Sequence, residues 1–188
     1  GDIFDGGAGF DTARYDSATA GVIAFMTDAW ANTGEAAGDA YISVEALYGS
    51  NFNDTLAGAS NANELQGFDG TDFIYGYGGN DFIGGGDGDD FLEGGAGTDQ
   101  LQGGAGNDQF IFRTGESNGD RVLDFAGNGA AVGDNLLFIG YGTAAQGATF
   151  TQLDATHWQI TSADGLITDI IELLNGASVD PSDYAFVT

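Results

Sequence analysis

The 188-residue chain contains no cysteine and no lysine, and it has a single proline, a single methionine and a single histidine, His157. The absence of cysteine excludes disulfides and thiolate metal sites, and it suits an exported bacterial protein that does without disulfides. Because the one histidine stands apart from the repeats described below, a zinc site is disfavoured as well. Any metal site in this chain must therefore be built from oxygen atoms.

Basic residues are nearly absent. Three arginines, Arg14, Arg113 and Arg121, stand against 29 acidic residues and leave a formal net charge of −26. Such a surface repels nucleic acid and anionic membranes, so we expect neither as a partner. It also repels itself, and compaction therefore requires bound cations. Because 42% of the residues are hydrophobic, the chain is too apolar to be a simple solvated tail.

Long apolar runs are also missing, and we expect no membrane insertion. The first residues, GDIFDGG, lack the basic and apolar regions of a signal peptide. They begin partway through a repeat, so we expect the chain to be the C-terminal fragment of a longer protein.

Residues 49–111 consist of seven nine-residue units in unbroken register, and every unit begins with glycine. The sixth positions are Asp54, Asn63, Asp72, Asp81, Asp90, Asp99 and Asp108. The eighth positions are Leu56, Leu65, Ile74, Ile83, Leu92, Leu101 and Phe110. A fixed period is the mark of a stacked repeat fold, because nothing in a flexible Gly-rich linker would hold these residues in phase.

Each unit has room for one tight turn and one short strand of about 10 Å. The strand occupies positions seven to nine with its middle residue pointing inward, and the glycines of the turn supply backbone angles that side chains forbid. Two units make one coil of 18 residues. The repeats thus predict an all-β fold with two short parallel sheets around a thin apolar core.

Turns two units apart stack at about one strand spacing, which brings Asp72 close to Asp90 and Asp90 close to Asp108. Carboxylates this close require a cation between them at neutral pH. A pair of turns offers about six oxygen ligands of variable geometry, which suits Ca²⁺ better than Mg²⁺. The repeats therefore predict several bound calcium ions.

The units at residues 94–102 (GGAGTDQLQ) and 103–111 (GGAGNDQFI) resemble the nonapeptide repeat of RTX (hemolysin-type) calcium-binding proteins. Residues 43–58 resemble the segment that leads into such repeats, and residues 107–125 resemble the start of the C-terminal domain of serralysin-type secreted proteins. The resemblance implies a parallel β-roll closed by a C-terminal β cap. It also implies export by a type I secretion apparatus that reads an uncleaved C-terminal signal, which residues 183–188 resemble.

In this family, calcium is held by the sixth-position acids and by carbonyl oxygens of the Gly-rich turns. The corresponding acids here are Asp11, Asp54, Asp72, Asp81, Asp90, Asp99 and Asp108. The corresponding glycines are Gly67, Gly70, Gly76, Gly79, Gly85, Gly88, Gly94, Gly97, Gly103 and Gly106. Since Asn63 lacks a charge and the first two units lack the motif's inner glycines, we expect the tightest sites in the five turns from residue 67 to residue 108. For Asp120, Asp124 and Asp134, we favour solvation at the surface over an extra metal site in the closing region.

The chain divides into four segments. Residues 1–14 carry the first, degenerate repeats, and residues 15–48 form an inserted strand and loop segment, interpreted as an enlarged coil or side hairpin rather than a binding insert. Residues 49–111 form the seven-repeat β-roll, and residues 112–188 form the C-terminal β cap with the secretion signal.

We expect the aromatic residues of the repeats and the insert to have structural roles. Phe73 and Phe91, two units apart at seventh positions, should stack on one outer face, with Phe82 on the other. Cross-strand packing is favoured over a docking face for an upstream domain or a polysaccharide. Trp30, in the insert, is expected to pack.

The sequence contains no catalytic motif that indicates an enzyme. Residues 115–119 (GESNG) match the G-x-S-x-G pattern, but a strand-like segment follows Ser117 where a nucleophile elbow needs a helix. No HExxH is present, so the protease domain of serralysins is absent from these residues. We interpret His157, beside Trp158, as a strand residue.

The first functional hypothesis is a calcium-binding module that folds on Ca²⁺ binding after secretion and stabilises the C-terminal end of a larger extracellular bacterial protein. Its partners would be calcium ions, the type I secretion apparatus and an upstream domain of the same chain. The alternatives are a calcium-dependent binding module for polysaccharide at a cell surface, as in the alginate epimerases that the chain also resembles, or the non-catalytic part of a secreted protease, lipase or epimerase.

Overall fold

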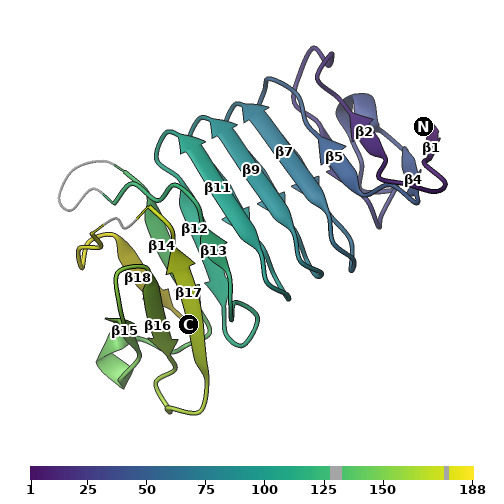
Figure 1. The fold of residues 1–188 in the computed structure, drawn as a ribbon. Coiled ribbons are helices and arrows are strands. Elements are labelled where there is room, and N and C mark those ends of the chain that lie inside the picture. The colour runs from purple at the N-terminus through teal and green to yellow at the C-terminus, as the bar shows by residue number, and fades with distance from the viewer. Residues whose placement is uncertain (128–132, 176–177) are drawn as a thin grey trace.

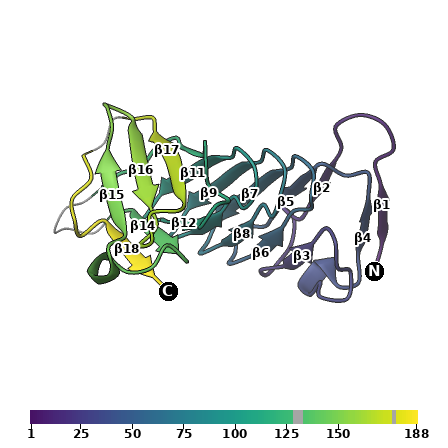
Figure 2. The same ribbon diagram turned by 90° about the horizontal axis from the view of Figure 1, so that it is seen from below.

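The computed structural model describes residues 1–127, 133–175 and 178–188. The protein is an elongated stack of short strands with its two termini at opposite ends, as Figures 1 and 2 show. No helix in these three ranges is long and apolar enough to span a membrane.

One face of the stack is a seven-stranded sheet in which all neighbours are parallel. Its strands, in spatial order, are β3 (Ile23–Phe25), β6 (Thr55–Ala57), β8 (Phe73–Tyr75), β10 (Phe91–Glu93), β12 (Gln109–Arg113), β14 (Asn135–Ile139) and β18 (Tyr184–Val187).

The other face is a nine-stranded sheet. Its strands, in spatial order, are β2 (Thr12–Arg14), β5 (Ala46–Tyr48), β7 (Glu64–Asp69), β9 (Phe82–Asp87), β11 (Gln100–Ala105), β13 (Arg121–Val122), β17 (Thr168–Leu173), β16 (His157–Thr161) and β15 (Thr149–Gln152). Pairing is parallel from β2 to β17, and β16 and β15 then join antiparallel.

The remaining elements are short. Strands β1 (Ile3–Asp5) and β4 (Ala40–Ile42) form a separate parallel pair, and two single-turn 3₁₀ helices, η1 (Gly34–Ala36) and η2 (Ala144–Gln146), lie in connections. The chain alternates between the two large sheets once per nine-residue unit, which is the parallel β-roll that the repeats predict.

In the roll, the core consists of two rows of eighth-position side chains, one row on each sheet, and all of these side chains are fully buried. In the seven-stranded sheet, Leu56 lies opposite Ile74, which lies opposite Leu92. Leu65 and Ile83 are paired in the same way in the other sheet. Because every coil contributes only two such residues, the core is thin, and each coil depends on its neighbours to cover it.

The inserted segment contributes strands to both sheets. Strand β3 pairs with β6 and strand β5 pairs with β7, so the coil is enlarged by its connections while the strand pairing of the roll continues. The packing expectation for Trp30 is wrong, because its side chain is 98% exposed. The indole is therefore open to solvent rather than packed.

The cap continues one sheet and closes the other. Strands β14 and β18 extend the seven-stranded sheet, whereas β17, β16 and β15 turn back as an antiparallel meander beside β13. This change of direction ends the stack (Figure 1). Ile160, Ile171 and Leu173 of these strands belong to the same buried core as the side chains of the roll.

We expect Leu92→Ala to lower the free energy of unfolding of the calcium-loaded protein by about 3 kcal/mol. The substitution leaves a cavity in the row of core side chains, and the neighbouring coils cannot move in to fill it. Urea denaturation at fixed calcium concentration measures it. The same substitution at Leu166, which is 82% exposed, should change stability by less than about 0.5 kcal/mol. Equal losses in the two variants would contradict the assignment of the core.

Candidate functional site

The acids of the turns are inside the protein. Each sixth-position residue directly precedes a strand of the roll, and the five aspartates from Asp72 to Asp108 are no more than 1% exposed. A surface charge would normally be solvated, so the burial of a whole row of carboxylates needs an explanation in terms of their partners.

One oxygen of each carboxylate is used to join neighbouring coils. The Oδ1 atom of Asp72 accepts the backbone N–H of Asp54 at 2.8 Å, and Oδ1 of Asp90 accepts that of Asp72 at 2.8 Å. The same bond recurs at Asp81, Asp99 and Asp108, at 2.8 to 3.0 Å. The acids therefore form two ladders, one at each edge of the roll, whose rungs are 18 residues apart.

The second oxygen of each carboxylate is buried and has no hydrogen-bond partner. This holds for Oδ2 of Asp11, Asp72, Asp81, Asp90, Asp99 and Asp108. An acceptor-only oxygen that is removed from water without a donor costs free energy unless a cation reaches it.

The first-position glycines leave open the space beside these oxygens. A Cβ on Gly67 would lie 2.0 Å from Oδ2 of Asp72 and 2.7 Å from the carbonyl oxygen of Gly85, one coil further on. Gly76 and Gly85 show the same two neighbours, with Oδ2 of Asp81 or Asp90 at 2.3 or 2.2 Å. At Gly94 and Gly103, Oδ2 of Asp99 or Asp108 likewise lies within 2.3 Å. Two oxygen types that repel each other thus converge on one small space, which fits a cation with oxygen ligands.

The fourth-position glycines serve the stacking of the turns. Gly70, Gly79, Gly88, Gly97 and Gly106 all have φ between 114° and 150°. A Cβ on Gly97 would lie 1.6 Å from the carbonyl oxygen of Gly79. No side chain fits at this position, so the turns can approach to contact distance.

Burial changes the acidity of these groups in the metal-free protein. It raises the pKa of Asp72, Asp81 and Asp108 to about 7 and that of Asp90 to about 6, against the usual 3.8, although the N–H that each accepts acts in the opposite direction. Burial also raises the pKa of Asp99. Near neutral pH, protons and a metal ion therefore compete for the same oxygens.

The two degenerate units differ from the others. Asp54 needs no cation, because its carboxylate accepts the N–H and the hydroxyl of Ser50 at 2.5 and 2.8 Å and the N–H of Val22 at 2.7 Å. Asn63 accepts the N–H of Ala59 at 2.7 Å and donates to the carbonyl of Glu45. At both positions, other groups of the protein form hydrogen bonds with the side chain.

At the N-terminal end, Asp11 keeps a free buried oxygen. Its backbone N–H donates to Oε2 of Glu45 at 3.0 Å, so Glu45 takes the place that a sixth-position aspartate has elsewhere in the ladder. The carbonyl of Ser43 lies 2.2 Å from the position of a Cβ on Gly6, the first residue of this turn.

The ladders extend into the cap, and the expectation that Asp120 and Asp134 are solvated is wrong. They are 2% and 3% exposed. Oδ1 of Asp120 accepts the N–H of Asp99 at 2.9 Å, and Oδ1 of Asp134 accepts that of Asp108 at 3.0 Å. Burial raises the pKa of Asp120 to about 8 and also raises that of Asp134. Their spacings of 21 and 26 residues break the period of 18, which hid them from a search for repeats.

Asp124 also joins coils, but by a different pair of bonds. Its two carboxylate oxygens accept the N–H groups of Gly103 and Gly104, both at 2.9 Å. The carboxylate thus holds the last turn of the roll against the cap.

Among the described residues, no three acidic or histidine side chains gather at one point. An ion between two turns would accordingly have at most two carboxylates, and its other ligands would be carbonyl oxygens or water. Such a set suits Ca²⁺, which takes six to eight oxygen ligands in flexible geometry.

The serine of the GESNG motif has a structural bond. The hydroxyl of Ser117 donates to the carbonyl of Arg113 at 3.2 Å, and strand β13 follows where a nucleophile elbow needs a helix. The imidazole of His157 is half exposed and lies 2.9 Å from the carboxylate of Asp154.

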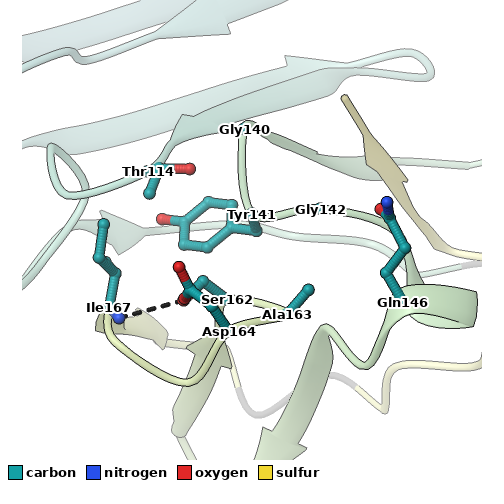
Figure 3. A pocket seen from close by; sticks show the side chains of 9 residues that line it. All are labelled: Thr114, Gly140, Tyr141, Gly142, Gln146, Ser162, Ala163, Asp164 and Ile167. Carbon is teal, nitrogen blue, oxygen red and sulfur yellow. Dashed lines mark hydrogen bonds between the residues drawn. The ribbon is translucent and has the colours of Figure 1, made fainter.

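A pocket of about 430 Å³ lies in the cap, away from the turns. Figure 3 shows Tyr141, Ser162, Asp164 and Ile167 around it. The Ser162 hydroxyl donates to Asp164 at 2.6 Å and accepts the N–H of Ile167 at 3.1 Å. These groups satisfy one another and leave no free buried oxygen of the kind that the turns contain.

The predicted aromatic stack is present on the outer face of the seven-stranded sheet. The rings of Phe73 and Phe91 are parallel within 2°, with centroids 4.5 Å apart. Because the two residues are directly paired across β8 and β10, cross-strand packing accounts for the stack.

Comparison with known proteins matches the turns to a repeat family. Two stretches, residues 48–83 and 84–116, match the family model described as RTX calcium-binding nonapeptide repeat (4 copies). No curated protein matches this chain.

Two solved structures are similar over most of the chain. The R3 subunit of the Azotobacter vinelandii mannuronan C5-epimerase AlgE6 is 28% identical in sequence. The match covers 72% of this chain and 78% of that subunit, with a TM-score of 0.33. The R2 subunit of the same enzyme is 27% identical, with coverages of 77% and 94% and a TM-score of 0.32.

The raised acidities predict a pH dependence. Because the folded pKa values of about 6 to 7 lie above the usual 3.8, the metal-free fold binds more protons than the unfolded chain. The stability that these four carboxyl groups contribute is therefore fully present below about pH 4 and is lost as the pH rises through about 7. Calcium binding should follow the opposite course and weaken as the pH falls from 8 to 5.

Circular dichroism in chelator at pH 5 and pH 8 measures the first effect, and calorimetric calcium titration at the same two values measures the second. A calcium affinity that does not change between pH 8 and pH 5 would contradict the assignment of these carboxylates as the binding groups.

Proposed function

We propose that this β-roll chain, whose residues 48–83 and 84–116 match the RTX calcium-binding nonapeptide repeat, is a module that folds when calcium binds after export from the cell. In this proposal, the aspartates from Asp72 to Asp108, with carbonyl oxygens of the glycine turns, hold the ions. The folded roll and cap then stabilise the C-terminal end of a larger extracellular bacterial protein.

The observation that carries the proposal is the row of buried carboxylate oxygens without hydrogen-bond partners. The protein offers them no positive charge of its own, because the chain has no lysine and its arginines pair with other acids. These ion pairs are Arg14 with Asp16, Arg113 with Glu93 and Arg121 with Glu172. Neutralisation must come from ions in solution.

The calcium gradient across the cell envelope supplies the switch. Extracellular calcium modules typically bind with dissociation constants of about 10⁻⁴–10⁻³ M, far above cytoplasmic calcium. Inside the cell, the charge of −26 keeps the chain expanded and ready for export. Outside, binding and folding become one event, because a site made by stacking two turns does not exist in the unfolded chain.

We further propose that export uses a type I apparatus that reads the C-terminal residues 183–188, in which an acid precedes apolar residues. The module acts by binding and folding rather than by catalysis. In support of this, the Ser117 hydroxyl is engaged by a main-chain carbonyl and the abundant acids are accounted for by the ladders.

Circular dichroism of the chelated protein at pH 8 should show a coil, and addition of millimolar calcium should produce a strand spectrum. Magnesium at the same concentration is the control. It should not produce the transition, because it demands compact octahedral geometry and releases its water reluctantly. A calcium-free protein that is fully folded at this pH would refute the proposal.

Two truncations at the same position of the repeat test the ligand assignment. Asp90→Ala removes a charged carboxylate with a free oxygen that lies between two turns, and we expect calcium affinity to fall by about tenfold or more. Asn63→Ala removes a neutral side chain that already has protein partners, and we expect a smaller loss. Calorimetric titration compares them, and equal losses would count against the stacking of turns 18 residues apart.

A further inference from the structure

The row of acids that precede strands of the seven-stranded sheet does not stop at the repeats. Asp54, Asp72, Asp90 and Asp108 come directly before β6, β8, β10 and β12. In the cap, Asp134 comes directly before β14 and Asp183 directly before β18. The last strand of this sheet is thus introduced by an acid in the same way as the strands of the roll.

Asp183 has the property that marks the acids of the turns. Its side chain is 0% exposed. Oδ2 accepts the backbone N–H of Asp180 at 2.8 Å, whereas Oδ1 is buried and has no hydrogen-bond partner. Among the described residues, the other carboxylates with such an oxygen all belong to Gly-rich turns of the repeat type.

The surroundings of Asp183 resemble the arrangement beside the turn glycines in part. A Cβ on Gly127 would lie 2.8 Å from Oδ2 of Asp183, 2.7 Å from the carbonyl oxygen of Ser178 and 2.8 Å from the Phe125 ring. A carboxylate and a main-chain carbonyl thus come together here as they do at Gly67, but the carboxylate oxygen beside Gly127 is the one that accepts the N–H of Asp180, and the unpartnered oxygen is the other one, Oδ1. The backbone of Gly127 is not in the left-handed region. Its lack of a side chain therefore matters for the space beside these oxygens.

No basic side chain can neutralise this carboxylate. The three arginines form ion pairs with Asp16, Glu93 and Glu172, and the imidazole of His157 lies beside Asp154. The available donor atoms are oxygens only, which selects a hard cation.

We propose that Asp183 and the carbonyl oxygen of Ser178 bind a calcium ion in the cap, outside the nonapeptide repeats. The site rests on the proposed function for the identity of the ion. Because Asp183 leads into β18, which pairs with β14 along Tyr184–Val187, the ion fastens the last strand of the chain onto the sheet. Calcium would then order the C-terminal residues together with the roll.

The test is a calcium titration of the whole chain by calorimetry. Asp183→Asn keeps the shape of the side chain and removes its charge, and we expect it to bind one calcium ion fewer than the wild type. Asp180→Asn is the matched control, since Asp180 lies in the same turn, is exposed, and contributes its backbone N–H rather than its carboxylate. It should bind the wild-type number of ions.

An Asp183→Asn protein that folds and binds as many ions as the wild type would overturn the proposal, since a purely structural carboxylate tolerates the amide. Circular dichroism of the same samples separates this outcome from a failure of the proposed function. If the wild type shows no calcium-driven strand formation, the folding module is wrong, whereas the ion count still decides the cap site.

A crystal structure of the calcium-loaded wild type decides the matter where Asp183→Asn fails to fold. We expect a cation about 2.3–2.6 Å from Oδ1 of Asp183 and from the carbonyl oxygen of Ser178. A water molecule at hydrogen-bond distance in that place, with no cation, would overturn the proposal.

Discussion

The structure depends on one interaction, the bond from a backbone N–H to the carboxylate of the acid one coil further along. In the roll, the donor and acceptor of this bond are 2.8 to 3.0 Å apart, and the bond thereby fixes how closely successive turns stack. It also forces each carboxylate into the interior, where its second oxygen has no protein donor. The bond that holds the stack together is thus the one that creates the need for an ion.

The rest of the composition follows from this constraint. Turns that stack at contact distance exclude side chains, which explains the glycines at the first and fourth positions of the turns. Coils that contribute two apolar residues each cannot bury enough surface to overcome the repulsion among buried acids. Basic side chains would neutralise the acids permanently, and under the proposed function their near absence leaves folding under the control of the surrounding ions.

The repeated part of the fold could be predicted from the sequence because one residue type per position decides it. A period of nine predicts the buried rows of side chains from Leu56 to Phe110, the positions of the aspartates and the Phe73–Phe91 stack. Asp120 and Asp134 could not be found in this way, because loops of other lengths carry them to the same ladders. The exposure of Trp30 could not be predicted either. Its loop is not periodic, so the sequence pattern does not indicate whether another segment covers the indole.

The source of cohesion changes along the ladder. At Asp54, the hydroxyl and N–H of Ser50 and the N–H of Val22 satisfy the carboxylate without an ion. From Asp72 to Asp108, the protein supplies one donor and leaves the second oxygen without one. At Asp124 and Asp134, backbone N–H groups again satisfy both oxygens. The unsatisfied oxygens from Asp72 to Asp108 are therefore flanked by positions that protein donors satisfy, and under the proposed function this middle stretch is where the cohesion of the stack depends on bound ions.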